Sequence, residues 1–208
     1  MLAVNMVWTP FIRVFSGDGM DSTIERNVKI LSREKAALLL IDIQEKILKV
    51  MNNPGQVIQN SIKLIKGFKI LNIPIFYTEQ YPKGLGETSA LLRKELEGIT
   101  AIQKLSFSCF GADNFFVRLK NNDISQIVIA GIESHVCVQQ TTLDLLANKF
   151  QVDVAADAVS SRKETDYKFA LDRMRAHGAE ITTTEAILFE LLNVSGTDEF
   201  KAISRIVK

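Results

Sequence analysis

Neither cysteine nor charge of one sign is abundant in this sequence. Its 208 residues include two cysteines, too few for a disulfide framework in a chain of this size, which favours a reducing, cytoplasmic setting. The 25 basic and 24 acidic residues nearly cancel, so there is no electrostatic footprint for nucleic acid or an anionic membrane surface. The longest purely apolar run, Ala36 to Ile41, is far below the ~18 residues of a membrane-spanning helix. We therefore expect the partner to be a small molecule, not a nucleic acid or a membrane.

Several motifs that bind cofactors or metals are also missing. IDIQEKI, which ends the first apolar run, contains no glycine, and this excludes the glycine-rich loops that bind dinucleotides or nucleotide phosphates. The only two histidines, His135 and His177, are not part of a carboxylate–histidine cluster typical of a zinc site. The GxSxG sequence of many serine hydrolases is absent. The sequence therefore predicts no cofactor and no metal site.

The N-terminal region differs from the rest of the chain. It lacks the basic start, long apolar centre and small-residue cleavage site of a secretion signal. A transit peptide stays an alternative, because no acidic residue precedes Asp18, and Met20 could equally be a start of translation. We expect residues 1–33 to be an extension or arm, and residues 34–208 to form one domain around a single core.

From residue 36 onward, short apolar runs alternate with longer stretches of helical periodicity. Such alternation indicates right-handed crossovers between parallel strands covered by helices on both faces. The expected strands are 36–42, 73–79, 100–104, 126–132, 151–157 and 179–184, and 81–86 is expected to be a loop. The sequence therefore predicts an α/β fold: a three-layer α/β/α arrangement with a mostly parallel, six-stranded, doubly wound sheet.

Capping signals mark three of the expected helix starts. Asp113 is placed as the N-cap of one helix. Ser161 with Glu164, and Thr182 with Glu185, have the spacing of a capping box. In this motif each of the two side chains accepts a hydrogen bond from the backbone N–H of the other residue.

Three chemically active side chains follow the expected strands. Asp42 ends the first strand, Lys104 ends the third, and Cys137 comes shortly after the fourth. Ligands of doubly wound sheets bind at the carboxyl ends of the strands, near the point where strand order reverses. A carboxylate, a cation and a thiol at that edge predict a site for nucleophilic catalysis.

Cys137 alone has two interpretations, an inert buried thiol or a nucleophile at a helix start. If Ser134 caps the helix, Cys137 lies in its first turn, where the N–H groups and helix dipole favour a thiolate. Lys104 would lower the thiol pKa further. His135 is two residues away and would not face Cys137. Cys109 is expected in the core or in a pocket wall.

Three stretches together resemble the isochorismatase-like cysteine hydrolase family, especially its isochorismatase domain-containing branch. They are LLLIDIQ with Asp42, QKLSFSCF with Lys104, and AGIESHVCVQQTTLDL with Cys137. The resemblance extends from about Lys35 to the C-terminus. It implies the isochorismatase-like hydrolase fold, a catalytic triad of Asp42, Lys104 and Cys137, and assembly into a homo-oligomer.

The resemblance also implies a cis peptide bond between Ile132 and Glu133. The backbone N–H groups of Glu133 and Cys137 would then form an oxyanion hole. Nicotinamidase-type members bind zinc through a carboxylate and histidines that this chain lacks. Isochorismatases proper typically lack the cysteine, so Cys137 is evidence against isochorismate as substrate.

These observations predict a metal-independent hydrolase of a small amide-like or related acyl substrate, acting through a thioacyl-enzyme. Two alternatives stay open: an isochorismatase-type vinyl-ether hydrolase, and a non-catalytic member whose thiol senses oxidants. Side chains near the strand ends are candidates for substrate binding, although ordinary core positions are an equal interpretation for the aromatic ones. They are Gln44, Tyr77, Tyr81, Phe107 and Phe110.

Overall fold

The computed structural model describes residues 26–208, of which Leu31–Lys208 form one compact unit. Residues 1–25 of the predicted extension, 1–33, lie outside the described residues, so its boundary at residue 33 stays a prediction. Within residues 26–208, no helix is long and apolar enough to cross a membrane.

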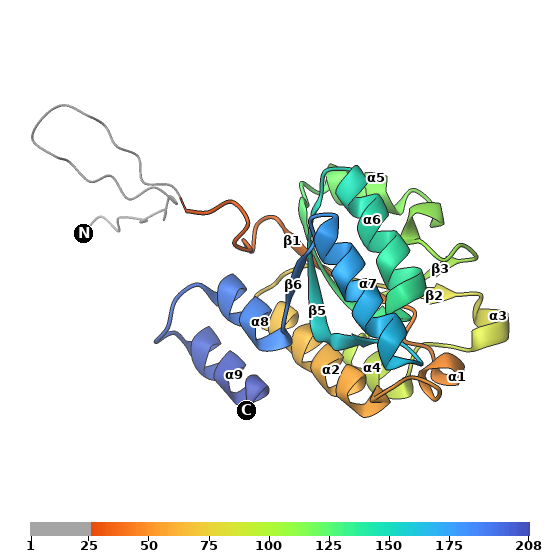
Figure 1. Ribbon diagram of the computed structural model, residues 1–208. Coiled ribbons are helices and arrows are strands. Elements are labelled where there is room, and N and C mark those ends of the chain that lie inside the picture. Colours follow the sequence, from red (N-terminus) through yellow and green to blue (C-terminus); the bar gives the residue numbers. More distant parts are fainter. Residues whose placement is uncertain (1–25) are drawn as a thin grey trace, which may run out of the picture. The chain divides into compact units, whose positions relative to one another are not determined.

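One six-stranded sheet forms the centre of the unit, and all its strand pairs are parallel (Figure 1). The strand order is β3-β2-β1-β4-β5-β6. The chain thus builds outward from β1 to β3, returns to the other side of β1, and builds outward again from β4. The prediction of a six-stranded parallel sheet is confirmed. The strands are β1 (Ala36–Ile41), β2 (Ile75–Gln80), β3 (Ile102–Lys104), β4 (Gln126–Ile132), β5 (Gln151–Ser160) and β6 (Glu180–Thr182).

Helices cover both faces of the sheet, giving the predicted three layers (Figure 1). One face packs against α2 (Pro54–Ile70), α4 (Ala90–Glu95), α8 (Thr184–Leu192) and α9 (Asp198–Val207), and the other against α5 (Phe115–Asn121), α6 (Gln139–Ala147) and α7 (Glu164–Ala176). The short helices are α1 (Glu45–Leu48), α3 (Pro82–Leu85), a 3₁₀ turn at Cys109–Gly111 and a π-helical turn at Ser134–Val138.

The continuous apolar run of β1 follows from this arrangement. Successive side chains of a strand point to opposite faces. Leu38 and Leu40 therefore join the core beneath α2 and α8, whereas Leu39 and Ile41 join the core beneath α5 and α6. A strand buried on both faces needs apolar residues at every position, and all six residues of β1 are buried.

The three predicted capping arrangements are wrong. The N-cap of α5 is Asn114, not Asp113. Because β5 continues to Ser160, α7 begins only at Glu164 and its N-cap is Lys163. Thr182 cannot cap α8 because it pairs with Ala155 in the sheet, and Thr183 caps it instead by accepting from Ala186 N. The segment expected as a loop at 81–86 contains α3.

Candidate active site

The fold brings Asp42, Lys104 and Cys137 together at the carboxyl edge of the sheet. Asp42 directly follows β1, with a φ of 52°. Lys104 is the last residue of β3, and Cys137 lies in the π-helical turn after β4. Because β1 and β4 are the neighbouring strands at which the strand order reverses, this edge is where α/β sheets bind ligands.

Asp42 is the buried centre of this cluster. One carboxylate oxygen, Oδ2, accepts from Lys104 Nζ at 2.6 Å, and the other, Oδ1, accepts from Thr78 Oγ1 at 2.7 Å. The Cys137 thiol lies within electrostatic range of the carboxylate, and each group shifts the pKa of the other. Burial raises the pKa of Asp42, while the charge of Lys104 and the hydrogen bonds oppose that rise. Thr78, which lies on β2, carries no sequence motif that would have identified it.

The ammonium group of Lys104 is fully enclosed, with its side chain 0% exposed. Its Nζ donates to Asp42 Oδ2, to the carbonyl of Ser106 at 3.1 Å and to the carbonyl of Phe107 at 2.8 Å. These three acceptors match the three N–H bonds of an ammonium group. Lys104 therefore holds the Asp42 carboxylate and the 106–107 loop together.

The Cys137 thiol is held neutral, which corrects the expectation of a lowered pKa. Burial raises its pKa most, the charge of Asp42 raises it further, and only Lys104 acts in the opposite direction. Ser134 does not cap the helix. The N-cap is Glu133 without a side-chain hydrogen bond, and the buried Ser134 hydroxyl has no partner among the described residues. The resting pair is therefore a thiol beside a carboxylate that can take its proton.

The turn that carries Cys137, residues 133–138, has an unusual backbone. The peptide bond between Ile132 and Glu133 is cis. The Glu133 carbonyl accepts from the N–H groups of both Val136 and Val138, at 3.0 and 3.2 Å. Arg162, from the loop between β5 and α7, donates to Glu133 Oε1 at 2.8 Å. Nothing in the sequence around Arg162 indicated this contact.

The second cysteine borders the cluster, because its Sγ lies 3.9 Å from Thr78 Oγ1, whereas the two histidine rings make their contacts elsewhere. Cys109 is completely buried, its N–H donates to Thr141 Oγ1 at 3.0 Å, and burial raises its pKa to about 11. His135 Nδ1 lies 3.0 Å from Ser161 Oγ, and His177 Nδ1 lies 2.8 Å from the Arg173 carbonyl. Both ring contacts are therefore made away from Cys137.

The five candidate substrate-binding residues divide into two groups. Gln44 is buried, and its amide bonds Gln80 N, Gln80 O and Gly86 O, so it joins the end of β2 to the α3 region. Tyr77 belongs to the core beneath α2 and α4. Tyr81, Phe107 and Phe110 are about half exposed or more, at 49%, 53% and 60%.

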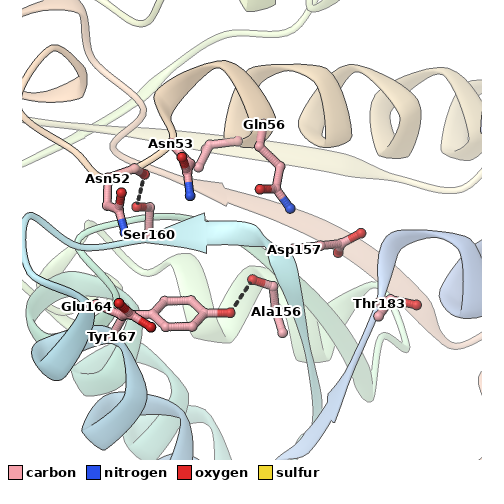
Figure 2. Close-up of a pocket in the computed structure, with 10 residues that line it drawn as sticks. Asn52, Asn53, Gln56, Ala156, Asp157, Ser160, Glu164, Tyr167 and Thr183 are labelled. Atoms are coloured by element: carbon pink, nitrogen blue, oxygen red, sulfur yellow. Dashed lines mark hydrogen bonds between the residues drawn. The ribbon is translucent and has the colours of Figure 1, made fainter.

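Two cavities are lined by residues outside the cluster. One of about 380 Å³ is lined by α1, α2 and Ser89. The other, of about 580 Å³, has a polar wall shown in Figure 2, where Asn53 and Gln56 extend from the start of α2 toward β5. Neither is lined by a residue of the Asp–Lys–Cys cluster. Across residues 26–208, no group of three or more His, Cys, Asp or Glu side chains could hold a metal ion.

Comparison with known proteins agrees with this architecture. A family model described as the isochorismatase domain matches residues 36–186. Isochorismatase domain-containing protein 2 of Danio rerio is 39% identical over 178 residues, covering 85% of this chain and 89% of that protein. Two solved structures are similar. MAR1 ribonuclease of Caenorhabditis elegans has a TM-score of 0.80 at 37% identity, covering 85% of this chain and 91% of that one. YcaC of Pseudomonas aeruginosa, described with hexane-2,5-diol and covalent acrylamide, has a TM-score of 0.79 at 25% identity, covering 86% and 92%.

The fold and the cluster define a class, the doubly wound α/β proteins with polar side chains gathered at the carboxyl edge of the sheet. Within that class, this chain belongs to the isochorismatase family of hydrolases. The family predicted from the sequence is confirmed.

Proposed function

We propose that this chain is a metal-independent cysteine hydrolase of a small amide-like or related acyl substrate, with Asp42, Lys104 and Cys137 as its catalytic residues. The observation that carries the proposal is the buried Lys104–Asp42 ion pair, 2.6 Å between Nζ and Oδ2, close enough to Cys137 for the Asp42 charge to raise the pKa of its thiol. A nucleophile, its base and a group that orients the base are the parts that thiol catalysis needs.

In the first half of the reaction, Sγ of Cys137 attacks the acyl carbon while its proton passes to Asp42. The raised pKa of the thiol makes this transfer part of the attack, because little free thiolate exists beforehand. Asp42 then returns the proton to the leaving amine, the C–N bond breaks, and a thioester remains. Lys104 favours the ionised form of Asp42 before the first transfer and holds the carboxyl group in place until the proton is returned.

In the second half, water attacks the thioester while Asp42 takes its proton. The C–S bond breaks, the acid leaves, and the proton goes to the Cys137 sulfur. The backbone N–H groups of Glu133 and Cys137 would stabilise the negative oxygen in both halves, and such donors contribute about 3 kcal/mol each in comparable sites. Tyr81, Phe107 and Phe110 are exposed enough to contact a substrate, and the roles of Gln44 and Tyr77 in binding stay predictions.

The covalent acrylamide named for the YcaC structure supports an alkylatable group in that relative. The ribonuclease name of another relative raises phosphodiester hydrolysis as a competitor. Lys104 is poorly suited to it, because all three of its N–H bonds are used within the protein and its side chain has no exposed surface. An acyl substrate fits the cluster better. Assembly into a homo-oligomer and a cytoplasmic location, both expected from the sequence, stay predictions.

The test is a screen of small primary amides and aryl esters with four proteins: wild type, Cys137→Ala, Asp42→Asn and Cys109→Ala. The last removes the other thiol and is the matched control. We expect turnover by wild type and Cys109→Ala only, and an acyl adduct on Cys137 in the intact mass. Undiminished turnover by Cys137→Ala would contradict the thioacyl mechanism and favour vinyl-ether chemistry. Peroxide oxidation of Cys137 that proceeds equally in Asp42→Asn, without any hydrolysis, would favour the redox sensor.

A further inference from the structure

The turn that carries Cys137 has no side-chain hydrogen bond at its start. Its N-cap, Glu133, makes no side-chain cap, and the hydroxyl of Ser134 has no partner among residues 26–208. The bonds from Val136 N and Val138 N to the Glu133 carbonyl are internal to the turn, so they shape the turn without fixing its place against Asp42. The position of the thiol must therefore depend on contacts from elsewhere in the fold.

Those contacts come from the loop between β5 and α7. Arg162 Nε donates to Glu133 Oε1 at 2.8 Å, and Ser161 Oγ lies 3.0 Å from His135 Nδ1. The loop thus contacts the turn on both sides of Ser134. The loop is itself fixed, because the Ser161 carbonyl accepts from Asn52 N at 3.0 Å and Ser160 pairs with Ile132 in the sheet.

The two partners of the ion pair differ in exposure. The Glu133 side chain is 8% exposed, whereas that of Arg162 is 58% exposed. An exposed ion pair contributes little to stability, but a buried carboxylate that loses its cation is left uncompensated, and this favours its movement toward water. Since Glu133 begins the turn, its movement would displace the backbone that leads to Cys137.

We propose that Arg162 is a positioning residue, which holds Glu133 and thereby keeps the Cys137 thiol against Asp42. This inference rests on the proposed thioacyl mechanism for its effect on turnover. Its effect on the thiol itself can be measured without any substrate. Loss of Arg162 lets the turn open locally, so that Cys137 becomes more exposed and separates from Asp42 while the rest of the fold persists.

Local opening has a distinctive signature. Burial and the Asp42 charge raise the pKa of Cys137, so a thiol that leaves this environment ionises more readily. Alkylation by iodoacetamide at pH 8 should therefore become faster in Arg162→Gln, while the buried Cys109 stays unlabelled. Turnover should change in the opposite direction, because a nucleophile displaced by about 1 Å loses as much as 10²-fold in rate.

The experiment compares wild type, Arg162→Gln, Arg162→Lys and Arg175→Gln. Arg175 is the matched control, since it is 56% exposed and pairs with Asp172 on α7 at 3.0 Å. Labelling of each cysteine is followed by peptide mass spectrometry, and acylation by the nitrophenolate burst from 4-nitrophenyl acetate. We expect Arg162→Gln to label faster at Cys137 only and to lose about 10-fold in burst rate at unchanged KM. Arg162→Lys should recover part of both effects, and Arg175→Gln should match wild type.

Glu133→Gln tests the role of the buried charge. With a neutral amide at position 133, no charge is left uncompensated when Arg162 is lost, so the double variant Glu133→Gln/Arg162→Gln should label Cys137 more slowly than Arg162→Gln alone. Wild-type labelling in Arg162→Gln would overturn the inference, as would simultaneous labelling of Cys109, which indicates general unfolding. A raised KM with unchanged Cys137 labelling would instead make Arg162 a substrate contact. A burst that survives Cys137→Ala would refute the proposed function, and the labelling result would still decide the position of the turn.

Discussion

At the scale of single residues, the protonation states of Asp42 and Cys137 depend on burial and on the groups around the Asp42 carboxylate. Lys104 forms an ion pair with the carboxylate, Thr78 donates to its other oxygen, and the pKa of the nearby Cys137 thiol responds to its charge. Because the charge of Asp42 disfavours a thiolate beside it, the resting site keeps the proton on sulfur. General-base assistance, rather than a preformed thiolate, is therefore the mode of activation that this geometry supports.

Thr78 should set the acid limit of activity. Its hydroxyl lowers the pKa of Asp42, which burial otherwise raises. Asp42 must be ionised to accept the thiol proton, so activity falls as the pH drops through the pKa of Asp42. In Thr78→Val that pKa rises further, and the acid limb of the pH–rate profile should move to higher pH. Removing one hydrogen bond to a charged group should also cost about 1–3 kcal/mol of stability.

The measurement is the pH dependence of the 4-nitrophenyl acetate burst, together with urea unfolding at pH 7. Thr78→Ser keeps the hydroxyl and loses one methyl group, so it should retain the wild-type acid limb. An unshifted limb in Thr78→Val would show that Asp42 does not govern the reaction.

At the scale of elements, the strands could be predicted from the sequence and the caps could not. β1 and β4 are buried along their whole length, so their apolar runs mark them clearly. Helix starts depend on how far the preceding strand stays paired. β5 runs three residues beyond the expected end, and Thr182 remains in the sheet, which moves both caps. The residues around each helix start do not reveal how far the preceding strand remains paired.

The same distinction applies to the site. Asp42, Lys104 and Cys137 could be predicted because strand ends converge at one edge of a parallel sheet. Thr78 and Arg162 could not, because Thr78 lies within β2 rather than at its end and Arg162 lies in a loop, so the strand-end rule marks neither. The protonation state of Cys137 also depends on enclosure by several elements, which a position near a helix start does not reveal.

The close approach of β4 to β1 leads to a prediction for Gly131. Its φ is +146°, and an added Cβ would lie 2.4 Å from the Ile41 carbonyl oxygen and 2.7 Å from Ile41 N. These are backbone atoms next to Asp42, so Gly131→Ala must push apart the two strands that carry Asp42 and the Cys137 turn. We expect a loss of at least about 1–3 kcal/mol in stability and a greatly reduced burst rate.

Gly98→Ala is the matched control for Gly131→Ala. Gly98 also has a positive φ, +84°, but an added Cβ would meet nothing within 4 Å. Gly98→Ala therefore introduces the strain of a positive φ without a steric clash, and it should retain the wild-type burst rate. Stability is measured by urea titration. If the two substitutions change the burst rate and the free energy of unfolding equally, the effect of Gly131→Ala comes from backbone strain and not from the spacing of β1 and β4.

At the scale of the whole molecule, enclosing two thiols makes folding stability depend on alkaline pH. Burial raises the pKa of Cys109 to about 11 and raises that of Cys137 as well. A thiol that is neutral when folded contributes stability that is complete below its unfolded pKa, about 8.5, and is lost as the pH rises through the folded value. The free energy of unfolding should therefore fall above about pH 8.5, by at most about 1.4 kcal/mol per pH unit for each thiol.

Comparison of wild type with Cys109→Ala isolates one of these contributions. Burial also raises the pKa values of Tyr77 and Tyr167, but both proteins contain these tyrosines, so their effect cancels in the difference. Urea unfolding at pH 8, 9 and 10 under reducing conditions should show a smaller loss of stability in Cys109→Ala, with the gap widening by about 1–2 kcal/mol across the range. Parallel curves for the two proteins would mean that Cys109 is accessible to water in the folded state. The core beneath α5 and α6 would then be open beside the Asp42 cluster, and the low polarity that keeps Cys137 neutral would lose its structural basis.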